Sequence, residues 1–174
     1  MSATRKLFFS LWPDSRQRDR LRDVISPATR LIDGRAVPRG NWHITLLYLG
    51  DFPETAIPGL LRKTSEIHVE PFRTRLDRVE FWPRPRIACL VPTSIPTELA
   101  RLHQLLQNIL DDAGFTLETN QFRPHMTVCR QARPFETQRL AQPATPEWTH
   151  FELMESIERR GERVYIPLKQ QLLE

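Results

Sequence analysis

Apolar and polar residues follow one another along this chain in two periods, one typical of strands and one typical of helices. Short segments rich in aromatic and β-branched residues, most of them closed by proline, glycine or aspartate, predict strands. The expected strands cover residues 6–12, 42–50, 72–81, 86–91, 122–130, 149–158 and 163–168. The last two are expected to form a closing hairpin around Gly161.

Three segments predict helices. The expected helices cover residues 14–25, 53–67 and 96–113. Asp14 or Ser15 is expected to cap the first helix, and Pro27 to interrupt it. The third helix is the clearest, because its leucines fall on one stripe and Gly114 stands at the C-terminal cap position. The proline-rich segment 132–146 predicts a loop.

The order strand, helix, strand, helix, two strands, helix, strand, hairpin predicts an α+β fold. The 174 residues are 40% hydrophobic and 26% charged, which is enough apolar surface for one core and predicts a single domain over residues 1–174. No apolar run approaches the roughly 18 residues that a membrane helix requires, and residues 1–6 lead into the first strand without a signal-peptide pattern. A cytoplasmic protein is therefore expected.

Charge and cysteine content narrow the partners only slightly. The formal net charge of +4 favours an anionic partner and permits RNA without identifying it. Cys89 and Cys129, the two cysteines, lack the spacing of a zinc site or a disulfide framework. Both are expected to be buried small apolar residues.

One short pattern occurs twice in a chain with five histidines. His43-Ile44-Thr45 recurs as His125-Met126-Thr127, 125 − 43 = 82 residues later. In a strand, residues i and i+2 point to the same face, so each triplet presents an imidazole and a hydroxyl side by side. If the two strands lie next to each other about a pseudo-twofold axis, they line a groove with two imidazoles and two hydroxyls. Such a groove can handle a phosphate group.

This set of side chains suits the opening of a cyclic phosphate by water. The reaction needs a base that takes a proton from the water and an acid that protonates the departing oxygen on the opposite side, and histidine can do both near neutral pH. The threonine hydroxyls can donate hydrogen bonds to the non-bridging oxygens. No metal and no other cofactor is expected. His103 is expected on the polar side of its helix, and His68 and His150 at the surface or in loops.

With these residues the chain resembles the two-histidine phosphoesterases, and most closely the bacterial and archaeal RNA 2′,3′-cyclic phosphodiesterases, also called 2′-5′ RNA ligases. The resemblance extends over essentially the whole chain. It rests on Arg5-Lys6-Leu7-Phe8-Phe9 with Trp12-Pro13, Asn41-Trp42-His43-Ile44-Thr45-Leu46, Leu49-Gly50, Phe81-Trp82-Pro83-Arg84, Phe122-Arg123-Pro124-His125-Met126-Thr127-Val128, Arg130 and Tyr165. It implies a bilobal, pseudo-twofold-symmetric fold in which two antiparallel sheets line a central groove and the helices lie outside.

The resemblance also implies roles for single residues. His43 would protonate the leaving 3′ oxygen and His125 would act as base on the water, leaving a 2′-phosphate end. Phe9 would stack on the terminal base, and Arg130 would contact the phosphate or the base. Because strict alternation from Thr127 puts Arg130 on the far face, its role requires a bulge or the end of the strand. The implied partner is RNA with a 2′,3′-cyclic phosphate end, such as a tRNA fragment, bound by a monomer away from any membrane.

Three other readings stay open on the sequence alone. The relevant reaction could be the reverse one, 2′-5′ RNA ligation, or the groove could belong to a non-catalytic RNA-binding module. A third is a phosphodiesterase for small cyclic nucleotides. Leu47-Tyr48 stands where the family more often has a small residue and phenylalanine, and Cys129 where alanine or leucine is usual. These departures concern the fit of the substrate rather than the type of reaction.

Overall fold

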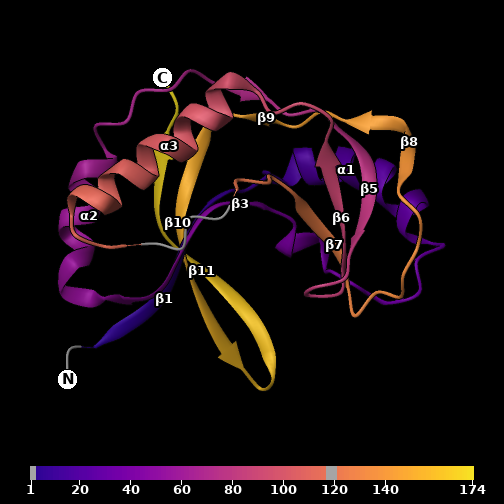
Figure 1. Ribbon diagram of the computed structural model, residues 1–174, viewed down its shortest axis with the longest axis horizontal. Helices are drawn as coiled ribbons and strands as arrows, with labels where there is room; N and C mark the ends of the chain where they lie inside the picture. The colour runs from indigo at the N-terminus through magenta and orange to yellow at the C-terminus, as the bar shows by residue number, and fades with distance from the viewer. Residues whose placement is uncertain (1–2, 117–120) are drawn as a thin grey trace.

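A computed structural model describes residues 3–116 and 121–174 of the chain (Figure 1). The helical elements are α1 (Ser15–Thr29), η1 (Arg39–Asn41), η2 (Glu54–Ala56), α2 (Ile57–Thr64) and α3 (Thr97–Asp112). The strands are β1 (Thr4–Leu11), β2 (Arg35–Ala36), β3 (Ile44–Pro53), β4 (Phe72–Arg73), β5 (Leu76–Trp82), β6 (Ile87–Pro92), β7 (Met126–Arg130), β8 (Gln138–Ala144), β9 (Glu147–Trp148), β10 (His150–Arg159) and β11 (Glu162–Leu172). None of the helices in this part of the chain is long and apolar enough to cross a membrane.

One antiparallel sheet runs through the molecule in the order β11-β10-β1-β3-β7-β6-β5-β8, with β2 added beside β7. Its two halves, β11-β10-β1-β3 and β7-β6-β5-β8, meet where Ile44 of β3 pairs with Met126 of β7. The expected α+β class is confirmed. The two sheets expected from the resemblance are the two halves of this sheet, joined at its centre.

The helices cross from one half of the sheet to the other. α1 follows β1 in the chain but packs on β7 and β8, whereas α3 follows β6 but packs on β3 and α2 (Figure 1). Each lobe therefore contains elements from both halves of the sequence. Of the two central strands, β7 is thus covered by α1 and β3 by α3.

The core lies between the helices and the side of the sheet that they cover. The stripe expected in the third helix is confirmed, because Leu99, Leu102, Leu106 and Leu110 are all fully buried. They belong to one continuous apolar cluster that also takes in the buried face of α1. The opposite side of the central strands is left for the site.

The first helix continues past its expected end. Pro27 lies inside α1, which ends at Thr29. The helix tolerates proline in its last turn because bonds on either side persist: the Thr29 hydroxyl donates to the Ile25 carbonyl at 3.0 Å, and the Arg30 N–H donates to Ser26 at 3.2 Å. At the other end Asp14 caps the helix, as predicted, by accepting a hydrogen bond from the Gln17 N–H at 2.7 Å.

Three more expectations about the elements need correction. The segment 132–146 contains strand β8, which pairs with β5 and forms an edge of the sheet, where a residue such as Pro143 without an N–H is tolerated. The expected strand 72–81 is divided, because β4 leaves the main sheet and pairs with β9. The expected helix 53–67 begins with the 3₁₀ turn η2 and ends at Thr64.

Candidate active site

The two motif histidines flank the centre of the sheet. His43 immediately precedes β3 and His125 immediately precedes β7, and these antiparallel strands are paired through Ile44 and Met126. Each histidine is thus one residue outside the strand on which it was expected. The two segments are nevertheless brought side by side, as the pseudo-twofold arrangement requires.

The threonines complete a set of four side chains. Continuing the antiparallel register from the central pair puts His43 across from Thr127 and Thr45 across from His125. Side chains that lie directly across from each other share one face of the sheet. All four residues are partly buried. The register therefore places both imidazoles and both hydroxyls on one face of the sheet, as the predicted groove requires.

A β-bulge follows each motif. The register between β1 and β3 skips Leu46, and the register between β6 and β7 skips Val128, in each case one residue after the motif threonine. The extra residue returns the next side chains to the groove face, namely Tyr48 in β3 and Arg130 in β7. The bulge on which the expected position of Arg130 depends is present.

Both imidazoles are held in the same way. Nδ1 of His43 lies 2.7 Å from the Asn41 carbonyl oxygen, and Nδ1 of His125 lies 2.8 Å from the Arg123 carbonyl oxygen. Because a carbonyl only accepts, Nδ1 carries the hydrogen in both rings. The Nε2 atom of each neutral ring then keeps its lone pair and can take up or deliver a proton.

The surroundings keep both rings neutral in the free protein. Burial lowers the pKa of His43 to about 4; the hydrogen bond to Asn41 opposes this shift, and the charges of His125 and Arg130 add to it. Burial likewise lowers the pKa of His125, with further lowering by Arg123 and Arg130. Arg130 therefore acts on both histidines. A bound phosphate anion would counter this positive charge and favour protonation.

Aromatic rings surround His43. The indole of Trp12 stacks on the imidazole with ring centroids 4.5 Å apart and planes 3° apart. Phe8 and Tyr165 lie against the same imidazole, with centroid distances of 5.4 and 5.3 Å. These three rings fix the orientation of His43 and exclude water from its sides.

His125 is held by a different group. Its ring centroid lies 4.4 Å from that of Trp82, and the guanidinium of Arg123 lies 4.2 Å above the Trp82 ring. The indole N–H of Trp82 donates to Glu80 at 2.9 Å. A cavity of about 450 Å³ opens beside this group and is lined in part by Trp82, Arg84 and Arg123. The surroundings of His125 thus include an indole with a guanidinium above it, whereas those of His43 are three aromatic rings.

Two small buried residues lie beside the motif threonines on the same face of the sheet. Ser10 pairs with Thr45, and Cys89 pairs with Thr127; both are 0% exposed. Burial and the charge of Glu80 raise the pKa of Cys89 to about 12, so this thiol stays neutral and is no nucleophile. Cys89 and Cys129 are free and buried, as predicted. Within residues 3–116 and 121–174, no three His, Cys, Asp or Glu side chains are placed to hold a metal ion.

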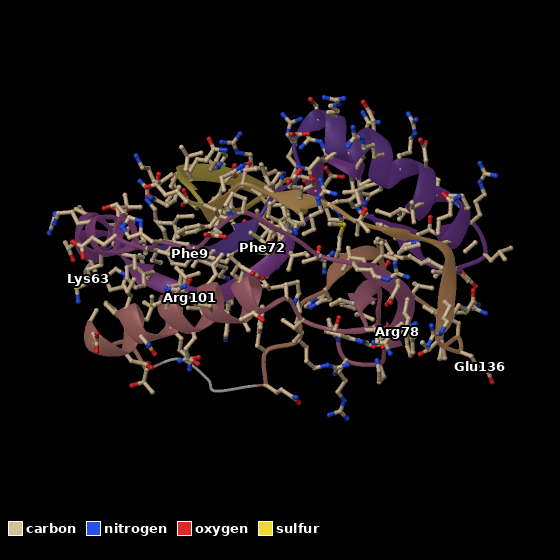
Figure 2. All side chains as sticks on the ribbon, turned by 90° about the horizontal axis from the view of Figure 1, so that it is seen from above. Phe9, Lys63, Phe72, Arg78, Arg101 and Glu136 are labelled. Carbon is tan, nitrogen blue, oxygen red and sulfur yellow. The ribbon has the colours of Figure 1, made fainter. Side chains whose placement is uncertain are left out.

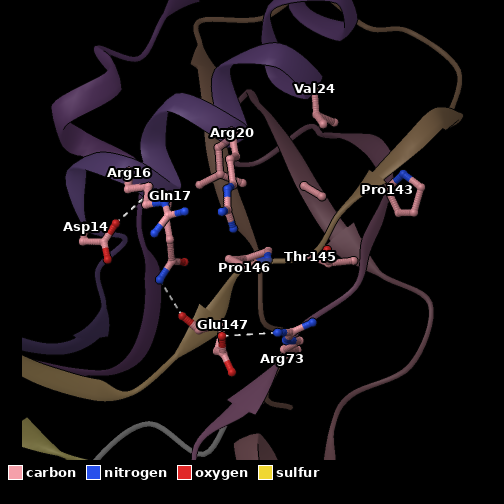
Figure 3. Close-up of a pocket in the computed structure, with 12 residues that line it drawn as sticks. Asp14, Arg16, Gln17, Arg20, Val24, Arg73, Pro143, Thr145, Pro146 and Glu147 are labelled. Atoms are coloured by element: carbon pink, nitrogen blue, oxygen red, sulfur yellow. Dashed lines mark hydrogen bonds and ion pairs between the residues drawn. The ribbon is translucent and has the colours of Figure 1, made fainter.

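A separate cavity of about 350 Å³ lies between the start of α1 and the segment that contains β9 (Figure 3). Its lining includes Arg16, Arg20 and Arg73, and the Arg73 guanidinium is paired with Glu147 at 3.3 Å. Gln17 donates to the Glu147 carbonyl oxygen at 2.7 Å across this cavity. Its lining residues include neither motif histidine, so it is distinct from the groove.

Comparisons with known proteins agree with this geometry. The family model described as LigT like Phosphoesterase matches residues 11–89. The RNA 2′,3′-cyclic phosphodiesterase of Escherichia coli is 28% identical over 173 residues, 97% of each chain, and that of Aeropyrum pernix is 31% identical over 114 residues, 64% of each chain. The crystal structure of E. coli LigT in apo form matches with a TM-score of 0.88, 26% identity and 99% of each chain covered. The chain is thus similar to the LigT-like phosphoesterases in sequence and in fold.

In this chain, Phe9 does not lie on the face that carries the motif residues. It is 1% exposed and packs edge-on against Phe151 in the core, with centroids 6.0 Å apart, so no face of its ring is open to a base. Figure 2 shows Phe9 within the packed interior of its lobe. Side chains alternate along β1, so its groove face carries Phe8 and Ser10, the neighbours of Phe9. Trp12 follows them just after the strand. The base-stacking role expected for Phe9 is therefore wrong, for a steric reason.

Two of the other histidines lie elsewhere than the sequence predicted. His103 was expected on the polar side of its helix, but its Nδ1 lies 2.7 Å from the Leu46 carbonyl oxygen and its ring stacks on Phe122 at 4.0 Å. His150 lies in β10 and pairs with Glu152 at 3.3 Å, rather than in a surface loop. His68 is exposed, as expected. One signal in the sequence could have found the aromatic rings around His43. Phe8 and Trp12 are an even number of residues apart, so alternation puts them on one face, and Phe9 on the other.

Proposed function

We propose that this chain hydrolyses 2′,3′-cyclic phosphate ends of RNA to 2′-phosphomonoesters by acid–base catalysis with His43 and His125. The observation that carries the proposal is the matched pair of imidazoles, each with Nδ1 bound to a carbonyl and Nε2 left for proton transfer. The relatives named RNA 2′,3′-cyclic phosphodiesterase support the choice of substrate.

The reaction requires the two histidines in opposite protonation states. His125 takes a proton from water as the water oxygen attacks phosphorus, the bond from phosphorus to the 3′ oxygen breaks, and protonated His43 delivers its proton to that oxygen. The 2′ oxygen keeps the phosphate. His125 is assigned as the base by the resemblance to the two-histidine phosphoesterases, and the aromatic rings that enclose His43 suit the role of the acid, which does not act on water.

The remaining groups stabilise charge. The Thr45 and Thr127 hydroxyls donate hydrogen bonds to the non-bridging oxygens of the phosphate, whose negative charge grows in the transition state. Arg130 supplies a permanent positive charge close to both histidines and so favours binding of the anionic end. Protons move only between histidine, water and the 3′ oxygen, so we further propose that no metal ion takes part.

The test uses an RNA oligonucleotide with a 2′,3′-cyclic phosphate end and the corresponding cyclic mononucleotide. We expect conversion of the oligonucleotide to the 2′-phosphate product, undiminished by a chelator. His43→Ala and His125→Ala are expected to lower turnover by roughly 10²–10⁴-fold. His68→Ala is the matched control, because His68 is exposed and lies outside the site. E. coli LigT has been crystallised with 3′-AMP, so binding of that nucleotide to this chain is a useful accompanying measurement.

Other outcomes would favour the other functions. Full activity in either histidine variant would contradict the assigned roles, and a requirement for added divalent metal would indicate a metal hydrolase. Equal or better turnover of the mononucleotide would make a small nucleotide the substrate. Binding of RNA without turnover would indicate a binding module, and joining of an RNA pair at the expense of hydrolysis would make 2′-5′ ligation the relevant reaction.

A further inference from the structure

An exposed aromatic residue occupies the position in β3 that corresponds to Arg130 in β7. Tyr48 follows the Leu46 bulge, as Arg130 follows the Val128 bulge, at the same number of residues from the motif threonine. Because β3 and β7 are antiparallel and meet at their first residues, these two positions lie toward opposite ends of the groove. One end carries a guanidinium and the other carries a phenol ring.

The register shows that Tyr48 belongs to the groove wall. Tyr48 pairs with Phe8 across β1 and β3, and paired residues project to the same face. Phe8 contacts the His43 ring on that face. Yet Phe8 is 3% exposed and Tyr48 is 53% exposed. Tyr48 is the aromatic member of a small set of exposed large hydrophobic residues among those described, whose other members are Leu31, Ile95 and Leu172.

We propose that the Tyr48 ring is the stacking platform for the terminal nucleobase of the RNA substrate. Two strand positions, about 7 Å, separate the Thr45 and Tyr48 side chains along the groove face, which is the distance scale between a ribose phosphate and the base of the same nucleotide. A ring held on a strand offers a flat apolar face at little entropic cost, and RNA-binding proteins stack unpaired bases on such rings. The role expected for Phe9 thus falls to a residue of the neighbouring strand. This inference rests on the proposed function for its substrate.

The experiment measures equilibrium binding of a short RNA with a 2′-phosphate end, and of the same RNA lacking its terminal base. Tyr48→Ala is expected to weaken binding of the intact RNA by about tenfold, within the range typical of one stacked base, and to leave binding of the abasic RNA unchanged. Tyr48→Phe keeps the ring and is expected to recover most of the loss. Leu31→Ala, which removes an exposed apolar side chain outside the groove, is the control for both RNAs.

Turnover of the cyclic-phosphate RNA provides the second measurement. There Tyr48→Ala is expected to raise KM about tenfold and to affect kcat much less, with an unchanged thermal unfolding midpoint. Equal weakening of both RNAs by Tyr48→Ala, or no weakening of either, would overturn the stacking role. Because binding is measured without turnover, an inactive wild type with base-dependent binding would refute the proposed hydrolysis alone. An active wild type without that dependence would refute the role of Tyr48 alone.

Discussion

Ile44 and Met126 form the one backbone pairing between β3 and β7 in the part of the chain that the structure describes. The two catalytic candidates precede these residues directly. The relative position of the two imidazoles therefore depends on one point of contact between the strands and on the elements that hold each strand from outside. The predictions below test those elements and the electrostatics of the site.

The pH at which kcat/KM is greatest should lie below neutrality. Burial lowers the pKa of both histidines in the free protein, that of His43 to about 4. The bell-shaped profile of kcat/KM reports the free enzyme, so its maximum is expected below pH 6.5. The profile of kcat reports the complex, in which the phosphate anion raises the pKa values of both histidines. The maximum of kcat is therefore expected at higher pH than the maximum of kcat/KM. A kcat/KM maximum above pH 7.5 at constant ionic strength would contradict the depressed pKa values.

Stability should fall on acidification through His43. Its pKa is about 4 in the folded protein and about 6.5 in the unfolded chain, so between these values the unfolded chain binds more protons. The free energy of unfolding thus rises with pH across this window, and the penalty is absent above pH 6.5. We expect His43→Asn to reduce the loss between pH 7 and pH 5 by about 1–2 kcal/mol, allowing for partial exposure. Urea titrations at both pH values measure this, and an unchanged difference would argue against it.

His103 should act as a positioning residue for the groove. It links the carbonyl of the bulge residue Leu46 to Phe122, three residues before His125. His103→Phe keeps an aromatic ring but leaves the buried carbonyl unpaired, which costs about 1–3 kcal/mol. We expect a lower unfolding midpoint and a fall in kcat larger than the change in KM. His68→Phe provides the control at an exposed histidine. If kcat stays at the wild-type value while the midpoint falls, His103 supports the fold without positioning the site.

Gly34 should be intolerant of a side chain because it packs against the end of β7. A Cβ atom there would lie 2.6 Å from the Cys129 sulfur and 3.0 Å from the Arg130 carbonyl oxygen. Gly34→Ala is therefore expected to cost roughly 1–3 kcal/mol and, by displacing Arg130, to raise KM. At Gly40 nothing lies within 4 Å of the same atom, so Gly40→Ala is the matched control. Similar unfolding midpoints for the two variants would show that the backbone around Gly34 can move away from β7 without loss of stability.

The sequence alone determined the order of the main helices and strands apart from β8 and β4, the buried stripe of α3 and the two triplets that contain His43 and His125. These features follow from local periodicity and from the chemistry of the residue types, which neighbours in space do not alter. Local periodicity could not show which alternate residues of β1 face the groove. Five consecutive residues, 7–11, are buried on both faces, so alternation could not show whether Phe8 or Phe9 faces the groove.

The tertiary structure alone decided the rest of the site. The bulges at Leu46 and Val128 change which residues face the groove, and they arise from pairing with β1 and β6, strands distant in sequence. The stacking of Trp12 on His43 and the hydrogen bond from His103 to Leu46 likewise join separate parts of the chain. Such contacts depend on strand register and on which half of the sheet each helix covers. Both are decided by the free energy of the assembled sheet, and neither leaves a local period in the sequence.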